Sequence, residues 1–175
     1  MVLAEAGGGG KSVNLPAPVV IDEFYRRDYE HALELLESSN DSSRRHALDM
    51  LGSAAGGTYN PAFSDECVRL IGERLTGVGH TTTVRQSAAS NLGRSRNPSA
   101  LDYLDTALRA SDAEKTGKYV TTVRANAAGA VALIRSAHTG SKDGVFERAT
   151  GILEYVAEHD KYDPARIARQ QLGIK

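Results

Sequence analysis

The sequence is poor in cysteine, aromatics and long apolar runs. Its one cysteine, Cys67, cannot form an internal disulfide and excludes a cysteine-based metal cluster. Tryptophan is absent and aromatic residues make up 6% of the chain, while alanine is abundant, which favours tightly stacked helices over a β-rich fold. No apolar run approaches the roughly 20 residues that span a bilayer, and Met1 to Gly10 lacks the features of a secretion signal. We therefore expect an all-α protein of the reducing cytoplasm with no membrane contact.

The first residues contain a glycine-rich stretch that resembles part of a phosphate-binding loop. The stretch GGGGKS ends at Ser12, but Glu5 stands where the loop motif requires its first glycine. Pro16 and Pro18 block the helix that would have to follow. We therefore expect residues 1–19 to be a flexible leader and residues 20–175 to form a single domain.

Four stretches of the chain resemble one another at steps of 41, 39 and 41 residues. They are SRRHALDMLGS from Ser43, VRQSAASNLGRS from Val84, VRANAAGAVALI from Val123 and PARIARQQLGIK from Pro164. In this alignment Leu51 matches Leu92, Val131 and Leu172. Self-similarity at this period is typical of stacked helical repeats, in which a single unit cannot bury its apolar face alone.

A second amphipathic segment precedes each of these stretches. Apolar residues recur at intervals of three and four in residues 22–37, 65–75, 100–110 and 145–159, which indicates helices. We expect Thr82 or Thr83, Thr122 and Asp163 to cap the second helices. The chain then forms eight helices in four antiparallel pairs, within repeats at about 22–54, 64–95, 99–136 and 144–175.

The pattern V-R-x-x-A-A-x-x-L-G of the second helices resembles the HEAT-like repeats, including those named after phycobilisome lyases. It is clearest at Val84 and Val123. The first copy has Arg44-Arg45 in place of Val-Arg, and the last has its arginine shifted to Arg166. The resemblance covers residues 22–175 and implies a right-handed α-solenoid of about four HEAT-like helical hairpins.

Few residues suggest catalysis, a cofactor or a metal. Cys67 lies on a predicted helix beside Val68 and Leu70, as a partly buried structural thiol does. The five histidines lie far apart with no H-x-x-x-H spacing, and the sequence has no G-x-S-x-G motif. We therefore predict no catalytic, cofactor-binding or metal-binding residue.

Charge is distributed unevenly along the chain, although the net charge is −1. Residues 20–76 carry 6 basic and 11 acidic side chains, a net −5, whereas residues 77–142 carry 9 basic and 4 acidic, a net +5. In stacked repeats the second helices line the concave surface, so arginines there can form a positive stripe for an acidic partner or a phosphate backbone. The predicted partner-binding residues are Arg85, Arg94, Arg96, Lys115, Lys118, Tyr119, Arg124 and Arg135.

These arginines also have structural interpretations. Arg85 and Arg124 occupy the repeat position whose side chain often ties loops or neighbouring repeats together. Arg94, Arg96 and Arg135 lie at the far ends of helices, where a cation offsets the helix dipole by about 0.3–1 kcal/mol.

Two connectors add candidate contacts. Lys115, Lys118 and Tyr119 lie in a predicted connector over residues 111–122, and Tyr59 and Phe63 lie in another over residues 52–64.

Three functions remain open at the level of sequence. The first is a non-catalytic scaffold that binds a partner protein on its concave or loop surface. The second is association with nucleic acid or a ribonucleoprotein, such as the ribosome, through the basic residues 77–142. That reading is weakened because Tyr103 and Tyr119 are the only aromatic residues there to stack on bases. The third is an enzyme accessory or lyase-like protein, which the resemblance alone suggests.

Overall fold

The computed structural model describes residues 20–110, 118–160 and 162–174, with only the backbone of residues 118–121. These residues form no strand but a 3-10 turn, Glu23–Tyr25, and eight α-helices, which confirms the expected all-α class. The helices are α1 (Arg26–Leu36), α2 (Asp41–Gly57), α3 (Pro61–Thr76), α4 (Thr82–Ser95), α5 (Ala100–Leu108), α7 (Lys118–Ala137), α8 (Val145–His159) and α9 (Asp163–Leu172).

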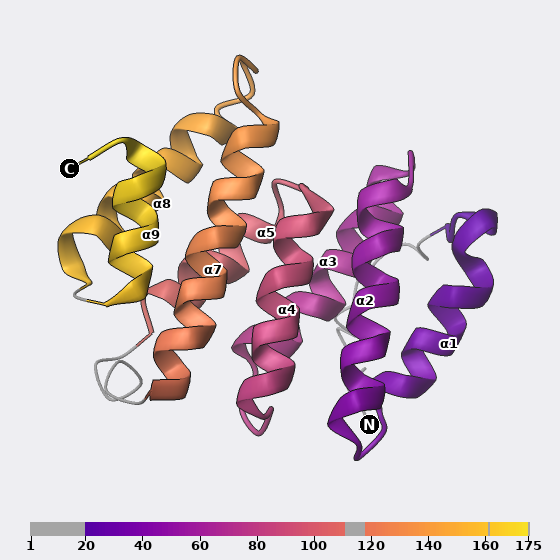
Figure 1. Ribbon diagram of the computed structural model, residues 1–175. Coiled ribbons are helices and arrows are strands. Elements are labelled where there is room, and N and C mark those ends of the chain that lie inside the picture. Colours follow the sequence, from indigo (N-terminus) through magenta and orange to yellow (C-terminus); the bar gives the residue numbers. More distant parts are fainter. Residues whose placement is uncertain (1–19, 111–117, 161, 175) are drawn as a thin grey trace, which may run out of the picture.

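The helices pack in sequential pairs, α1 with α2, α3 with α4, α5 with α7, and α8 with α9, as the sequence predicts. Figure 1 shows two layers. The second helices of the pairs, α2, α4, α7 and α9, lie side by side in front, and each packs against the next. Of the first helices, α3, α5 and α8 lie behind them, and α1 lies at the right edge beside α2.

The core lies between the two layers and is built from the repeating apolar positions. Leu51, Leu92 and Val131, which align in the sequence repeat, are all fully buried, and Leu172 is partly buried at the open end. Burying one such side chain contributes about 1.5–3 kcal/mol. The repeat in the sequence is therefore a repeat of core contacts.

Three details differ from the expected helix boundaries. Asp163 is the first residue of α9 and not its cap, because the capping position is taken by Tyr162. Thr81 caps α4 by accepting a hydrogen bond from the Val84 backbone N–H at 3.4 Å, one residue before the expected position. Thr122 lies inside α7, because that helix already begins at Lys118. More than one threonine precedes Arg85 and Arg124, and any of these threonines could serve as the N-cap. The sequence alone therefore does not predict at which threonine each helix begins.

The expected connector over residues 52–64 is mostly helix. α2 continues to Gly57, α3 begins at Pro61, and the Asn60 side chain caps α3 by accepting from the Phe63 N–H at 3.2 Å. Tyr59 is fully exposed, but Phe63 is fully buried in the core. The prediction of an exposed Phe63 is therefore wrong. Glycines at 56 and 57 resemble a loop in the sequence, yet both pack against neighbouring chain.

Neighbouring second helices approach so closely that only glycine fits at two aligned positions. A Cβ atom on Gly52 of α2 would lie 2.9 Å from the Cβ of Asn91 on α4. A Cβ on Gly93 of α4 would lie 2.7 Å from the Cα of Ala130 on α7. Both distances are shorter than van der Waals contact, so either side chain would push the helices apart.

This packing predicts opposite effects of the same substitution at two helical glycines. Gly93→Ala should lower the free energy of unfolding by about 1–3 kcal/mol, because the added methyl group overpacks the α4–α7 contact. Gly129→Ala should raise it by about 0.5–1 kcal/mol, because no neighbouring atom lies within 4 Å and alanine favours the helix. Urea denaturation of both variants measures the difference. Equal shifts for the two variants would contradict the close approach.

Candidate functional site

Arg85 and Arg124, which align in the repeat, bind the same kind of partner inside the fold. The Arg85 Nε donates to the backbone carbonyl of Leu75 at 2.9 Å, near the end of α3. The Arg124 Nη1 donates to the carbonyl of Leu108, the last residue of α5. Each arginine at the start of a second helix therefore satisfies a carbonyl at the end of the first helix in its pair. This is the structural role that the sequence offered as an alternative.

Because Arg124 is buried, it cannot belong to the predicted positive stripe on the surface. Its side chain also forms an ion pair with Asp160, and the two side chains are 4% and 6% exposed. This pair joins α7 to the residue that ends α8, 36 positions away. A buried guanidinium with such partners cannot contact another molecule unless the fold opens, so Arg124 is not a surface residue.

Arg135 is also engaged within the fold. Its Nε donates to Thr150 at 2.7 Å, its Nη1 donates to the carbonyl of Gln171 at 3.3 Å, and its guanidinium lies over the ring of Phe146. These contacts join α7 to α8 and α9. Of the predicted connector residues, Lys115 lies outside the described residues. Lys118 and Tyr119 lie in the first turn of α7, and their side chains are not described.

Arg94 and Arg96 are the predicted basic residues that the structure places on the surface. Arg94 is 59% exposed at its side chain and lies 3.9 Å from the carboxylate of Asp49. Arg96 ends α4 in the left-handed conformation, with φ of 53°, a region that favours glycine and asparagine. Its carbonyl oxygen lies 3.2 Å from His138 Nε2.

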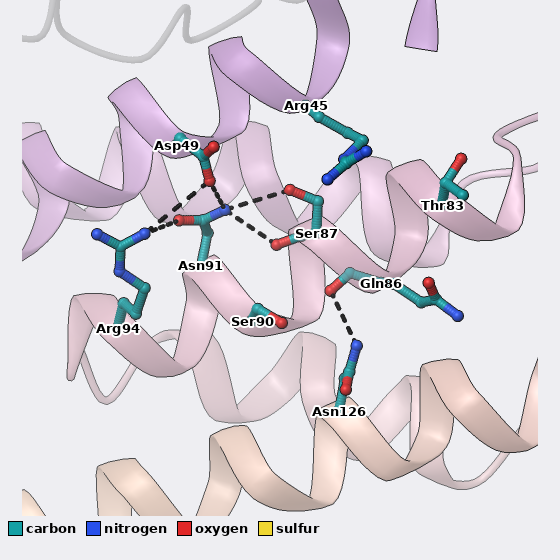
Figure 2. Close-up of a pocket in the computed structure, with 9 residues that line it drawn as sticks. All are labelled: Arg45, Asp49, Thr83, Gln86, Ser87, Ser90, Asn91, Arg94 and Asn126. Atoms are coloured by element: carbon teal, nitrogen blue, oxygen red, sulfur yellow. Dashed lines mark hydrogen bonds and ion pairs between the residues drawn. The ribbon is translucent and has the colours of Figure 1, made fainter. Parts of the chain in front are cut away.

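Both exposed arginines line a groove between α2 and α4, which we call the α2–α4 valley. Figure 2 shows its polar half, on which side chains of α2, α4 and α7 converge. The space that they line measures about 360 Å³. The lining residues are Arg45, Asp49, Thr83, Gln86, Ser87, Ser90, Asn91, Arg94 and Asn126. A second space of about 490 Å³ continues past Arg94 and is lined by Gly52, Ser53, Gly56, Gly57, Gly93, Arg94, Arg96 and Leu133. We call this the glycine half.

Asn91 holds the floor of the polar half in place. Its side chain, in a residue 2% exposed, donates to Asp49 Oδ1 at 2.9 Å and to the carbonyl of Ser87 at 3.0 Å. Figure 2 shows Arg94 converging on the same carboxylate and amide. The contact between Asn91 and Asp49 bridges α4 and α2, so the position of the Asp49 carboxylate is fixed by the packing of the two helices.

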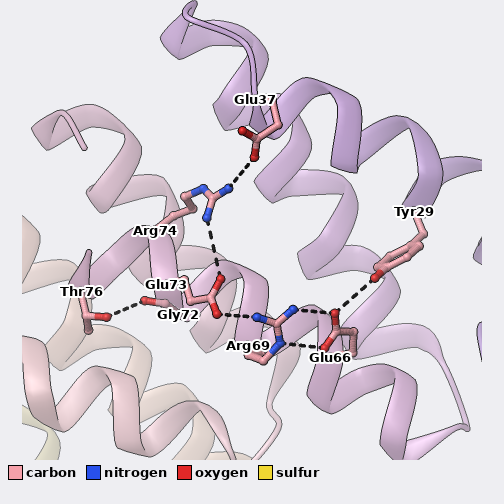
Figure 3. A network of polar contacts seen from close by, with 8 residues as sticks. All are labelled: Tyr29, Glu37, Glu66, Arg69, Gly72, Glu73, Arg74 and Thr76. Atoms are coloured by element: carbon pink, nitrogen blue, oxygen red, sulfur yellow. Dashed lines mark hydrogen bonds and ion pairs between the residues drawn. The ribbon is translucent and has the colours of Figure 1, made fainter. Parts of the chain in front are cut away.

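The acidic first part of the chain is partly neutralised by ion pairs behind the valley. Figure 3 shows Arg69 of α3 bound to Glu66, and Arg74 bound to Glu37, the residue that follows α1. The two nitrogen–oxygen distances are 2.7 Å and 3.2 Å. Arg69 holds the pKa of Glu66 below its usual range, and burial, together with that carboxylate, raises the pKa of Tyr29 to about 12. The Tyr29 hydroxyl donates to Glu66 at 3.4 Å. These side-chain contacts link α1 to α3.

The described residues hold no cluster of three or more histidine, cysteine, aspartate or glutamate side chains that could bind a metal ion. Burial raises the pKa of the Cys67 thiol to about 12, and the residue is fully buried. A thiol in that environment is protonated at neutral pH and is a poor nucleophile. No described helix is both long and apolar enough to cross a bilayer.

No protein-family model matches the chain, and no curated protein matches its sequence. The resemblance to HEAT-like repeats therefore rests on the aligned residues of the repeat itself.

Of the residues that line the valley, the sequence predicted Arg94 and Arg96 and missed the others, including Arg45, Asp49 and Leu133. A signal was present in the repeat. Arg45, Asp49 and Ser53 follow one another at four-residue intervals on α2, and Gln86, Ser90 and Arg94 occupy the aligned positions on α4. Residues at this interval share one face of a helix, so the aligned polar rows mark the valley.

The buried ion pair predicts a strong asymmetry between single and double substitutions. Asp160→Ala should lower the free energy of unfolding by about 3–5 kcal/mol, because it leaves the Arg124 guanidinium buried without its counter-ion. Arg124→Met with Asp160→Ala should recover more than half of that loss, since no uncompensated charge remains. Urea denaturation of the wild type, both single variants and the double variant completes the cycle. Additive losses would mean that the two side chains do not interact.

The environment of Cys67 predicts that its thiol is protected in the native state. A disulfide exchange reagent such as dithionitrobenzoate at pH 8 should react at less than about a hundredth of the rate seen in denaturant, because burial disfavours the thiolate and blocks access. The absorbance change in native buffer and in guanidinium measures the ratio. Rapid native labelling would mean that α3 opens readily.

Proposed function

We propose that the protein is a non-catalytic scaffold that binds an extended segment of a partner protein in the α2–α4 valley. We propose further that its two layers form a right-handed α-solenoid of about four HEAT-like repeats. The observation that carries the proposal is the set of exposed polar side chains, Arg45, Asp49 and Ser53 on α2 and Thr83, Ser90 and Arg94 on α4, that line the valley at successive levels. These side chains present hydrogen-bond donors and acceptors on the surface in a fixed order along the valley.

The dimensions of the valley suit a short length of extended chain. From Thr83 to Arg96 the lining follows α4 for about 20 Å, at about 1.5 Å per residue. An extended peptide of about six residues covers that length at 3.2–3.4 Å per residue. Ser87, Ser90 and Gln86 provide side-chain donors and acceptors of the kind that bind a peptide main chain.

The charges favour a protein partner over a nucleic acid. In the basic residues 77–142, Arg85, Arg124 and Arg135 bind atoms of the fold itself, and Arg109 binds Asp105 at 2.7 Å. Cations used in this way are not available to a phosphate backbone. The valley also includes the carboxylate of Asp49, which would repel phosphates there.

Filling the valley tests this function. Nonapeptides selected from a random displayed library on the wild-type protein should bind Ser90→Trp at least about tenfold more weakly, because the indole occupies an exposed position at the centre of the valley. Thr106→Trp, at an exposed position on α5 in the other layer, is the matched control and should bind normally. Fluorescence anisotropy with synthetic peptides measures both.

Two results would overturn the proposal. The first is a library that yields no binder, or binders that Ser90→Trp does not affect. The second is binding of a single-stranded RNA oligonucleotide that Ser90→Trp abolishes while no peptide is selected. That result would move the function to nucleic-acid association through residues 77–142.

A further inference from the structure

The exposed charges of the α2–α4 valley occur in a fixed order along its length. Arg45 lies in the polar half, Asp49 follows one turn later on the same helix, and Arg94 and Arg96 mark the glycine half. Figure 2 shows Arg45 and Arg94 directed into the valley from different helices, with Asp49 close to Arg94. The valley therefore presents positive charge at two places separated by a carboxylate.

The repeat gives the axial separation of the two positive places. Residues of α2 and α4 at the same level differ by about 41 positions, as the step of the repeat predicts. The hydrogen bonds from Thr83 to Asp41 and from Asn91 to Asp49 both join residues 42 positions apart. The backbone of Arg94 therefore lies level with Ser53, eight residues along α2 from Arg45, so the two side chains leave their helices about 12 Å apart along the axis. The Arg94 guanidinium itself reaches back to within 3.9 Å of the Asp49 carboxylate.

From this spacing we infer that the partner segment carries two acidic residues four positions apart. In an extended chain, residues i and i+4 are separated by about 13 Å, which matches the distance along the valley. One carboxylate then binds Arg45 and the other binds Arg94 and Arg96. This inference rests on the proposed function and specifies the partner's chemistry.

Asp49 and the helix ends explain why the two anions are kept apart. A carboxylate placed midway between the arginines would meet the Asp49 carboxylate, which is fixed by Asn91. At the Arg45 end, the N-termini of α2 and α4 add positive dipole charge of about one half each, part of which is offset by the Asp41 carboxylate that accepts from Thr81 and Thr83. At the other end, the two C-termini contribute negative charge of similar size, and two arginines are needed there to leave a net positive charge.

The glycine half also specifies what lies beside the second carboxylate. Leu133 of α7 is 50% exposed, and its Cδ1 would lie 3.3 Å from a Cβ atom on Gly93. None of the residues that line the glycine half is acidic. An apolar side chain next to the second acidic residue can therefore pack on Leu133 without losing a polar contact.

The conformation of Arg96 provides a way to separate binding from stability. An arginine at φ of 53° is less favourable than asparagine, which enters the left-handed region readily. We therefore expect Arg96→Asn to remove the cation without loss of fold stability. If Arg96 has a structural role, Arg96→Asn should lower the free energy of unfolding. If Arg96 has a binding role, the variant should lower peptide affinity and leave the free energy of unfolding unchanged.

The test repeats the displayed nonapeptide selection on three proteins. On the wild type we expect enrichment of two Asp or Glu residues at a spacing of four, with an aliphatic residue beside one of them. On Arg45→Gln one acidic position should disappear from the consensus while the other is kept. On the double variant Arg94→Gln with Arg96→Asn the acidic position beside the aliphatic residue should disappear, with about tenfold weaker binding of the wild-type consensus peptide.

The control is Arg27→Gln with Arg166→Gln, which removes the same charge as the double variant from two exposed arginines on α1 and α9. It should keep the full consensus. Equal weakening by this control would mean that net charge alone attracts the peptides and would overturn the inference. The inference would also be overturned if the selected peptides carried no acidic pair but still bound Ser90→Trp more weakly than the wild type. In that case the proposed function would stand. Selection of no peptide at all would overturn both.

Discussion

The close approach of neighbouring second helices is the constraint on which the rest of the structure depends. At Gly52 and Gly93, aligned in the repeat, a single Cβ atom would collide with the next helix. Around these points, side chains of both helices line open spaces. The result is a valley with a floor of glycine and a buried asparagine and with polar side chains along its edges. The same small residues that let the helices pack therefore create the candidate site.

Most of the described arginines in residues 77–142 bind groups within the protein itself. Arg85 and Arg124 satisfy carbonyls at the ends of first helices, and Arg135 holds α8 and α9 against α7. Burying a guanidinium is costly unless its donors are paired, and Arg124 meets this condition with Asp160 and the Leu108 carbonyl. A charge count along the sequence therefore overstates the positive surface, because it gives equal weight to structural and exposed cations.

The sequence predicts the parts of this structure that are periodic. The repeat places Leu51, Leu92 and Val131 at equivalent core positions and gives eight helices in sequential pairs. It could not predict that α2 runs through Gly57, because this depends on contacts of the glycines with Tyr25 and Arg94, which are distant in the chain. The burial of Arg124 depends in the same way on Asp160, 36 residues away. Local propensity has no information about such partners.

The two layers differ in how their charges are balanced. Between α1 and α3, carboxylates such as Glu66 and Glu37 are bound by Arg69 and Arg74, so these opposite charges are satisfied within the layer. Along the valley, Asp49 has a partner within the fold, whereas the described part of the chain places no acidic side chain in the glycine half beside Arg96. Among the described charges that line the valley, Arg45, Arg94 and Arg96 therefore outnumber the single carboxylate of Asp49. An acidic segment that approaches the valley would be attracted to it, and the order of charges along the valley would then determine its register.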